Sequence, residues 1–310
     1  MLARIAENIY WMARYIERAE NTARLINVTT NLVLDLPRRT NVGWEYLVER
    51  QGTEELYDSL YEYIDEKSIL KFLISDNKNP KSILNSLQSA TEHASSLRDI
   101  IPREAWEQIN NLYSTAKLNV QSGFTRKNRH LYLHSIILGA QTITGQLAGT
   151  MYQDAGYDML RMGRNLERAD MTTRIIDVRS ADLLEDEHED LTPFDNLQWV
   201  SVLKSLTGYQ MYRRIVQVHV QRREVLKFLF QERKFPRSFY HSMCEVESCL
   251  LSLPKNQDCI DIVNKLQRFV IKKSPEKLLQ DELHIYIYKL QFNLNKIHTC
   301  IARTYFISGT

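Results

Sequence analysis

Two stretches of the chain repeat the same amphipathic helix. Residues 12–28 and 162–178 align at an offset of 150 positions, and nine of the seventeen aligned pairs are identical. Both copies contain Arg-x-x-Glu-Arg followed by alanine, with apolar residues at intervals of three and four. The offset is too long for a solenoid, whose repeats are roughly 20–50 residues long. The sequence therefore predicts an internal duplication, with halves at about 1–152 and 153–310.

In each copy the charged residues follow one face of the helix and the apolar residues follow the opposite face. Each copy also keeps two Arg residues four positions apart, although like charges at this spacing repel by about 0.2–0.5 kcal/mol in an isolated helix. We therefore expect the two helices to pack near a pseudo-two-fold axis, with each Glu accepting from guanidinium groups of the same or the opposite copy. A solvent-exposed polar face is the alternative interpretation. The predicted ionic cluster comprises Arg14, Glu17, Arg18, Arg24, Arg164, Glu167, Arg168 and Arg174.

The rest of the chain also favours helices. Only ten glycines and seven prolines occur in 310 residues, and no long strand-type alternation is present. The sequence predicts an all-α multi-helix bundle of about ten to twelve helices in a single domain, 1–310, with an acidic loop at 182–195. Helices are expected at 2–35, 42–63, 66–74, 80–100, from Pro102 onward, and at 128–151, 157–182, 196–231, 237–253, 256–273 and 276–306.

Charge and cysteine content limit the possible classes of protein. The formal net charge of +2 provides no global field for nucleic acid or an anionic membrane. No uncharged apolar stretch of about 18 residues is present, and the N-terminal sequence has no signal-peptide pattern, so we expect a cytoplasmic protein without a membrane partner. The four cysteines match no zinc or thiol-redox motif, and we expect them to be reduced core thiols.

Other candidate sites have simpler interpretations. His130 and His134 have the spacing of two metal ligands on a helix, but no third ligand accompanies them, so no metal or other cofactor is expected. The basic stretch 213–237 is interpreted as an intramolecular or partner contact rather than as a nucleic-acid site. Glu17 or Glu167 could act as a general base, but a neighbouring Arg lowers the pKa of a Glu and favours ion pairing.

The residues around both repeats resemble the Alpha-E family, a group of bacterial all-helical proteins of unknown function with a Glu-Arg motif. Residues 4–24 are similar to its first signature and residues 163–174 to its second. The resemblance implies a partner, because members are typically encoded beside, or fused to, a circularly permuted ATP-grasp protein, often with a transglutaminase-like protease. The sequence departs from the family pattern at Thr91, His93 and Ser95, where the family usually has Arg, Asn and Arg. An anion-binding role of the helix expected at 80–100 is therefore not carried over to this chain.

Three functions follow from these observations. The leading hypothesis is a non-catalytic helical partner of an ATP-grasp-type ligase in ATP-dependent peptide or amide bond formation. The first alternative is an enzyme in its own right that uses the Arg/Glu cluster as a substrate cleft. The second alternative is a purely structural protein that forms homo-oligomers.

Overall fold

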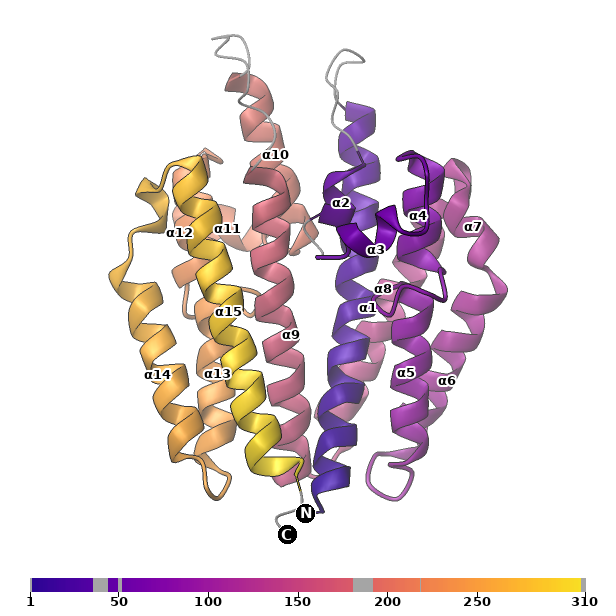
Figure 1. The fold of residues 1–310 in the computed structure, drawn as a ribbon, viewed down its shortest axis with the longest axis vertical. Coiled ribbons are helices and arrows are strands. Elements are labelled where there is room, and N and C mark those ends of the chain that lie inside the picture. The colour runs from indigo at the N-terminus through magenta and orange to yellow at the C-terminus, as the bar shows by residue number, and fades with distance from the viewer. Residues whose placement is uncertain (1, 36–43, 50–51, 181–191, 218, 308–310) are drawn as a thin grey trace.

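Two long helices form the centre of the molecule. In the computed structural model, α1 (Ala3–Asp35) packs along α9 (Ala155–Ser180), and each carries one of the repeats (Figure 1). The apolar side of each helix is buried, as at Met12 and Met162, which are both fully enclosed. Burying such a side chain contributes about 1.5–3 kcal/mol. The structure describes residues 2–35, 44–49, 52–180, 192–217 and 219–307.

Each central helix is packed against two others on its own side of the molecule, and a third helix covers those two (Figure 1). Helices α5 (Ile83–Ser95) and α8 (Arg126–Thr150) pack on α1, and α6 (Arg103–Leu118) packs on both of them. On the opposite side, α13 and α15 pack on α9, and α14 packs on both of these in turn. The two groups thus share one arrangement, while a duplication as its origin stays a prediction from the sequence. The second group comprises α13 (Phe239–Leu251), α14 (Gln257–Lys272) and α15 (Gln280–Tyr305).

Shorter helices complete the bundle, and the described residues contain no strand. The expected all-α class is therefore confirmed. Among these described residues, no helix combines the length and the apolar character that crossing a lipid bilayer requires. The shorter elements are α2 (Tyr46–Glu49), α3 (Glu54–Asp58), α4 (Glu66–Ile74), α7 (Val120–Phe124), α10 (Thr192–Ser205), α11 (Tyr209–Val216), α12 (Arg222–Gln231) and the 3₁₀ helix η2 (Pro275–Lys277).

Two of the predicted long helices are wrong. The helix expected at 42–63 is divided into α2 and α3, because Gly52 between them has a φ of +63°. The helix expected at 196–231 is divided into α10, α11 and α12, with left-handed residues at Thr207 and Gln217 where α10 and α11 end. Apolar periodicity continues through such breaks, so the sequence pattern did not reveal them.

The predicted acidic loop lies mostly outside the described residues. Residues 182–191 cannot be compared, but α10 already begins at Thr192, so the last part of the predicted loop is helical. Pro193 stands in the first turn of this helix, where the missing backbone N–H costs nothing and the fixed φ suits a helix. The loop prediction extended too far because it took this proline as part of the loop.

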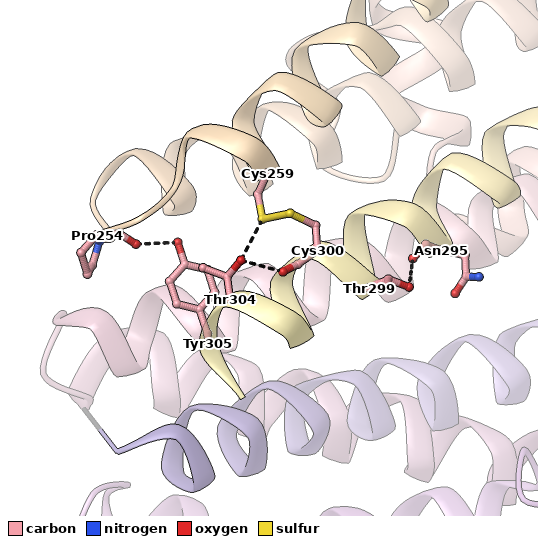
Figure 2. The surroundings of a disulfide bond; sticks show 7 residues. All are labelled: Pro254, Cys259, Asn295, Thr299, Cys300, Thr304 and Tyr305. Carbon is pink, nitrogen blue, oxygen red and sulfur yellow. Dashed lines mark hydrogen bonds between the residues drawn. A yellow bond between two sulfur atoms is a disulfide. The ribbon is translucent and has the colours of Figure 1, made fainter. Parts of the chain in front are cut away.

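The expectation that all four cysteines are reduced is wrong for two of them. Cys259 of α14 and Cys300 of α15 form a disulfide with a Cα–Cα distance of 5.7 Å (Figure 2). Tyr305 donates a hydrogen bond to the carbonyl of Pro254 nearby, at 3.0 Å. The 41-residue separation of the two cysteines matches no motif, so their pairing could be found only from the fold.

Candidate functional site

The two repeat helices are in close contact at a glycine. A Cβ atom added to Gly163 of α9 would lie 2.3 Å from the backbone oxygen of Tyr10 in α1. This is far below a normal contact distance, so a side chain here would push the helices apart. The aligned residue of the first copy is Ala13. The missing side chain of Gly163 therefore sets the distance at which the ionic faces of α1 and α9 meet.

Glu167 of α9 is bound by two arginines of α1. Arg14 donates from Nε to one carboxylate oxygen at 2.8 Å. Arg18 donates to both oxygens, from Nε at 2.5 Å and from Nη2 at 2.9 Å. Glu167 is only 1% exposed, so these contacts neutralise a carboxylate that is shielded from water. The two i,i+4 arginines of the first repeat thus share one acceptor on the opposite helix.

Glu17 of α1 is bound in a related way from α9. Arg168 donates to both of its oxygens, from Nε at 2.9 Å and from Nη2 at 2.8 Å. A second guanidinium, from Arg237, reaches the same carboxylate at 3.1 Å, and Asn21 donates to it at 3.0 Å. The glutamates of the two repeats are therefore held by arginines of the opposite repeat.

The arginines dominate the electrostatics of both glutamates. Burial alone would raise the pKa of Glu17, but Arg168 and Arg237 outweigh it and hold this pKa well below its usual range. Burial likewise opposes ionisation of Glu167, yet Arg18 and Arg14 lower its pKa to about 2. A carboxylate with so low a pKa is a poor proton acceptor at neutral pH. The arrangement suits ion pairs between helices better than acid–base chemistry.

The other predicted cluster residues divide into two kinds. Arg24 donates to Glu20 on its own helix and to Thr207, and Arg174 pairs with Asp170 on α9 at 2.7 Å. Arg164 differs, because its buried Nε has no hydrogen-bond partner among the described residues. Burial and the nearby Arg168 lower the pKa of Arg164. Among the described residues, every member of the predicted cluster forms an ion pair except Arg164, the counterpart of Arg14.

Sequence reasoning missed Arg237. It precedes α13 and donates to Asn21 at 2.9 Å and to Glu20 at 2.6 Å, besides its contact with Glu17. Arg237 lies at the end of the basic stretch 213–237, which was interpreted as a whole. Arg213 and other members of that stretch are exposed, whereas Arg237 is buried. Its position between a proline and a helix-capping serine was the signal that could have separated it from its neighbours.

The histidines do not form a metal site in the described part of the chain. His130 and His134 stack with their ring centroids 5.8 Å apart, and His130 contacts the side-chain oxygen of Asn27. Across the described ranges, no group of three or more His, Cys, Asp or Glu side chains could hold a metal ion.

His298 of α15 is hydrogen-bonded to the Tyr10 hydroxyl, near Arg14. Burial and Arg14 lower the pKa of His298 to about 4, so this imidazole is neutral at physiological pH.

Fold and site together define an all-helical protein whose two central helices are joined by buried arginine–glutamate pairs. Residues 1–306 match the Alpha-E family, which is described as a predicted alpha-helical domain with a conserved ER motif. The chain therefore belongs to the Alpha-E family, as the resemblance of the repeats indicated. The Glu-Arg pairs of that motif stand here at Glu17-Arg18 and Glu167-Arg168.

Two mycobacterial proteins that resemble the chain are described as uncharacterised. An uncharacterised protein of Mycobacterium tuberculosis is 25% identical over 191 residues, which cover 56% of this chain and 22% of that protein. An uncharacterised protein of Mycobacterium bovis matches to the same extent. The chain thus aligns with less than a quarter of the length of these curated relatives. No solved structure matches the chain.

Proposed function

We propose that the chain is a non-catalytic helical component of an ATP-grasp-type ligase system that forms peptide or amide bonds. The observation that carries this proposal is the engagement of both repeat glutamates, Glu17 and Glu167, in ion pairs across α1 and α9. The residues that mark the family thereby hold the scaffold together. The family resemblance supplies the partner, an ATP-grasp-type ligase, and for many members a transglutaminase-like protease as well.

The length of the relatives supports a role alongside other components. The matched region is 22% of the mycobacterial proteins, so an Alpha-E region there belongs to a much longer chain. An accessory domain beside a catalytic unit requires a stable fold but no catalytic activity of its own. Separating α1 from α9 would leave the buried charges of their ion pairs without partners, which holds the two helices together.

The main alternative, an enzyme in its own right, is favoured by one feature. A cavity of about 420 Å³ is lined by Arg14, Arg18 and Glu167, so a small molecule could bind beside these residues. The low pKa of Glu167 argues against its use as a general base in that cavity. Transition-state stabilisation by the arginines is the chemistry that this alternative retains.

The experiment combines the purified chain with the purified ATP-grasp protein encoded in the same genome. Size-exclusion chromatography measures complex formation, and ATP turnover is followed with candidate amine and carboxylate substrates. We expect a stable complex in which the ATP turnover of the ligase changes by at least about tenfold, a difference of about 1.4 kcal/mol in activation free energy. The chain alone should hydrolyse no ATP and form no amide.

Two results would contradict this function. Amide formation by the chain alone would establish the enzyme alternative. If the chain changes neither the elution nor the ATP turnover of the ligase, the proposed partnership is wrong. Arg164→Met should leave complex formation unchanged, because Arg164 lies in the same cluster yet its Nε has no acceptor among the described residues.

A further inference from the structure

A cavity with an excess of positive charge lies between α1, α9 and α15. Its volume is about 420 Å³, which falls within the range of small-molecule sites, about 300–1,000 Å³. Four cationic side chains line it against two carboxylates, a formal excess of two positive charges (four minus two). His298, which also lines it, is neutral because its pKa is lowered to about 4. The charged residues are Arg14, Arg18, Lys81, Arg174, Glu167 and Asp170.

The neutral part of the lining combines residues of α15 with apolar side chains of α1 and α9. Gln291 and Asn295 of α15 provide amide groups, and Trp11 and Leu294 provide apolar surface. A ligand in this cavity therefore meets guanidinium and ammonium groups together with amide and apolar groups. This combination is typical of sites for an organic molecule with one anionic end.

The equivalent place in the other half of the protein is filled. Lys81 and Arg237 both stand between a proline and a serine that caps the following helix. These helices, α5 and α13, pack on α1 and α9 respectively. Arg237 extends its guanidinium onto Glu17, Glu20 and Asn21. The space that remains beside Glu17 and Arg164, against α8, measures only about 10 Å³.

Lys81 leaves room where Arg237 does not. It lies beside Glu167 and Asp170, which align with Glu17 and Glu20. A lysine ends in a compact ammonium group instead of a planar fork, so it covers less of the surrounding surface. A cavity therefore remains beside Lys81, whereas the guanidinium of Arg237 fills the corresponding space beside Glu17.

The hydroxyl groups of two aligned threonines, Thr22 and Thr172, also differ between the two halves. Thr172 donates a hydrogen bond to the backbone oxygen of Arg237 at 3.0 Å. The aligned residue, Thr22, lines the cavity, is 1% exposed, and its hydroxyl has no hydrogen-bond partner among the described residues. A buried hydroxyl without a partner costs about 1–3 kcal/mol, so its position next to a cavity indicates a ligand atom that can complete it.

We propose that this cavity binds the carboxylate or phosphate group of a small organic molecule, held by Arg14, Arg18 and Lys81, with the Thr22 hydroxyl as a further donor. Arg14 and Arg18 already donate to Glu167 from Nε and, for Arg18, also from Nη2, so they offer the anion their remaining guanidinium N–H groups. The body of the ligand lies along Trp11 and Leu294 and accepts from the amides of α15. This binding belongs to the chain itself and does not depend on the ligase partnership.

The test uses the isolated chain and isothermal titration calorimetry with four probes. Phenyl phosphate and glutarate represent an organic phosphate and an organic carboxylate, inorganic phosphate lacks an organic body, and benzyl alcohol lacks the anion. We expect saturable binding of phenyl phosphate or glutarate, weaker binding of inorganic phosphate and none of benzyl alcohol. The stronger of the two organic anions identifies the ligand class. Failure of all the anionic probes to bind a folded protein would overturn the proposal.

Variants locate the binding site. Lys81→Gln and Thr22→Val should each weaken the better probe, the former by about tenfold, with unchanged circular dichroism. Lys78→Gln is the matched control, since Lys78 is exposed on the same loop and does not line the cavity. If both cavity variants bind as tightly as the unmodified chain, the anion lies elsewhere and the proposal is wrong. Because these assays omit any ligase, a negative result here leaves the proposed partnership to its own test.

Discussion

Arg168 of α9 holds both carboxylate oxygens of Glu17 on α1, with Nε and Nη2 at 2.9 and 2.8 Å. Replacing Arg168 by Met keeps most of the apolar stem and removes the charge. Glu17 then retains Arg237 but loses its two-point contact, so we expect unfolding free energy to fall by about 3 kcal/mol. Urea denaturation measures this change. A loss below about 0.5 kcal/mol would show that the pair does not stabilise the fold.

Arg164→Met is the matched control for that variant. Arg164 lies one helical turn before Arg168 on the same helix, but its Nε has no acceptor in the part of the chain that the structure describes. Its charge is also repelled by Arg168, which contributes to the lowered pKa of Arg164. We therefore expect Arg164→Met to be neutral or stabilising by up to about 1 kcal/mol. A destabilisation equal to that of Arg168→Met would mean that the observed pairing does not determine the cost.

A second prediction concerns the contact between the central helices. In Gly163→Ala, the new Cβ would meet the backbone oxygen of Tyr10 at 2.3 Å, and this backbone cannot move without shifting α1. We expect a loss of about 2–3 kcal/mol in unfolding free energy. Gly145→Ala is the control, because nothing lies within 4 Å of its added Cβ. In α8 the alanine should stabilise by about 0.5–1 kcal/mol through helix propensity alone.

The contacts of the repeat helices illustrate what the sequence could and could not predict. The i,i+4 arginines and the two glutamates suggested that α1 and α9 meet, because such charges recur only where a partner accepts them. The sequence left open whether each Glu binds arginines of its own copy or of the other copy. That choice depends on the helix separation set by Gly163, which is a matter of packing rather than of pattern.

The cavity was beyond the reach of sequence patterns for a related reason. Lys81 and Arg237 look like ordinary basic residues near turns, and their equivalence appears only when α5 and α13 are seen to pack on corresponding helices. Thr22 matches Thr172 in the repeat, but the sequence does not show that its hydroxyl lacks a partner, because a buried threonine is usually satisfied by its own helix. The breaks at Gly52 and Thr207 were similarly hidden, since apolar periodicity continues on both sides of each.

Acid pH should weaken the fold through Glu167. The folded-state pKa of this carboxylate is about 2, below the usual 4.5, so it contributes stability above pH 4.5 that disappears as the pH falls toward 2. We expect about 3 kcal/mol of unfolding free energy to be lost over this window. Urea denaturation at several pH values tests this with Glu167→Gln, which should show a flatter profile. Glu62→Gln, at an exposed position, should retain the steep profile of the unmodified chain.

Stability should increase at alkaline pH as Lys81 loses its proton. Burial and Arg174 lower its pKa to about 8 from 10.5, so the unfolded chain binds more protons between these values. Stability therefore carries a constant cost below pH 8 and rises as the pH increases from 8 toward 10.5. Lys81→Met should remove this cost and stabilise the protein by about 1–2 kcal/mol at pH 7. Thermal unfolding at about pH 7 and about pH 10 tests this, because the gain over the unmodified chain must shrink at the higher pH.

The disulfide between α14 and α15 closes a loop of 41 residues, which restricts the unfolded chain. In the loop-entropy description, a cross-link of this span stabilises a fold by about 4 kcal/mol. For protein purified without reductant, we expect the double variant Cys259→Ser/Cys300→Ser to unfold at lower urea concentration, and the difference to narrow when a reductant is added. Cys244→Ser removes a thiol outside the bond and should leave the effect of reductant unchanged. Mass spectrometry after alkylation of the unfolded, unreduced chain should find two labelled cysteines, whereas four would mean that the bond does not form.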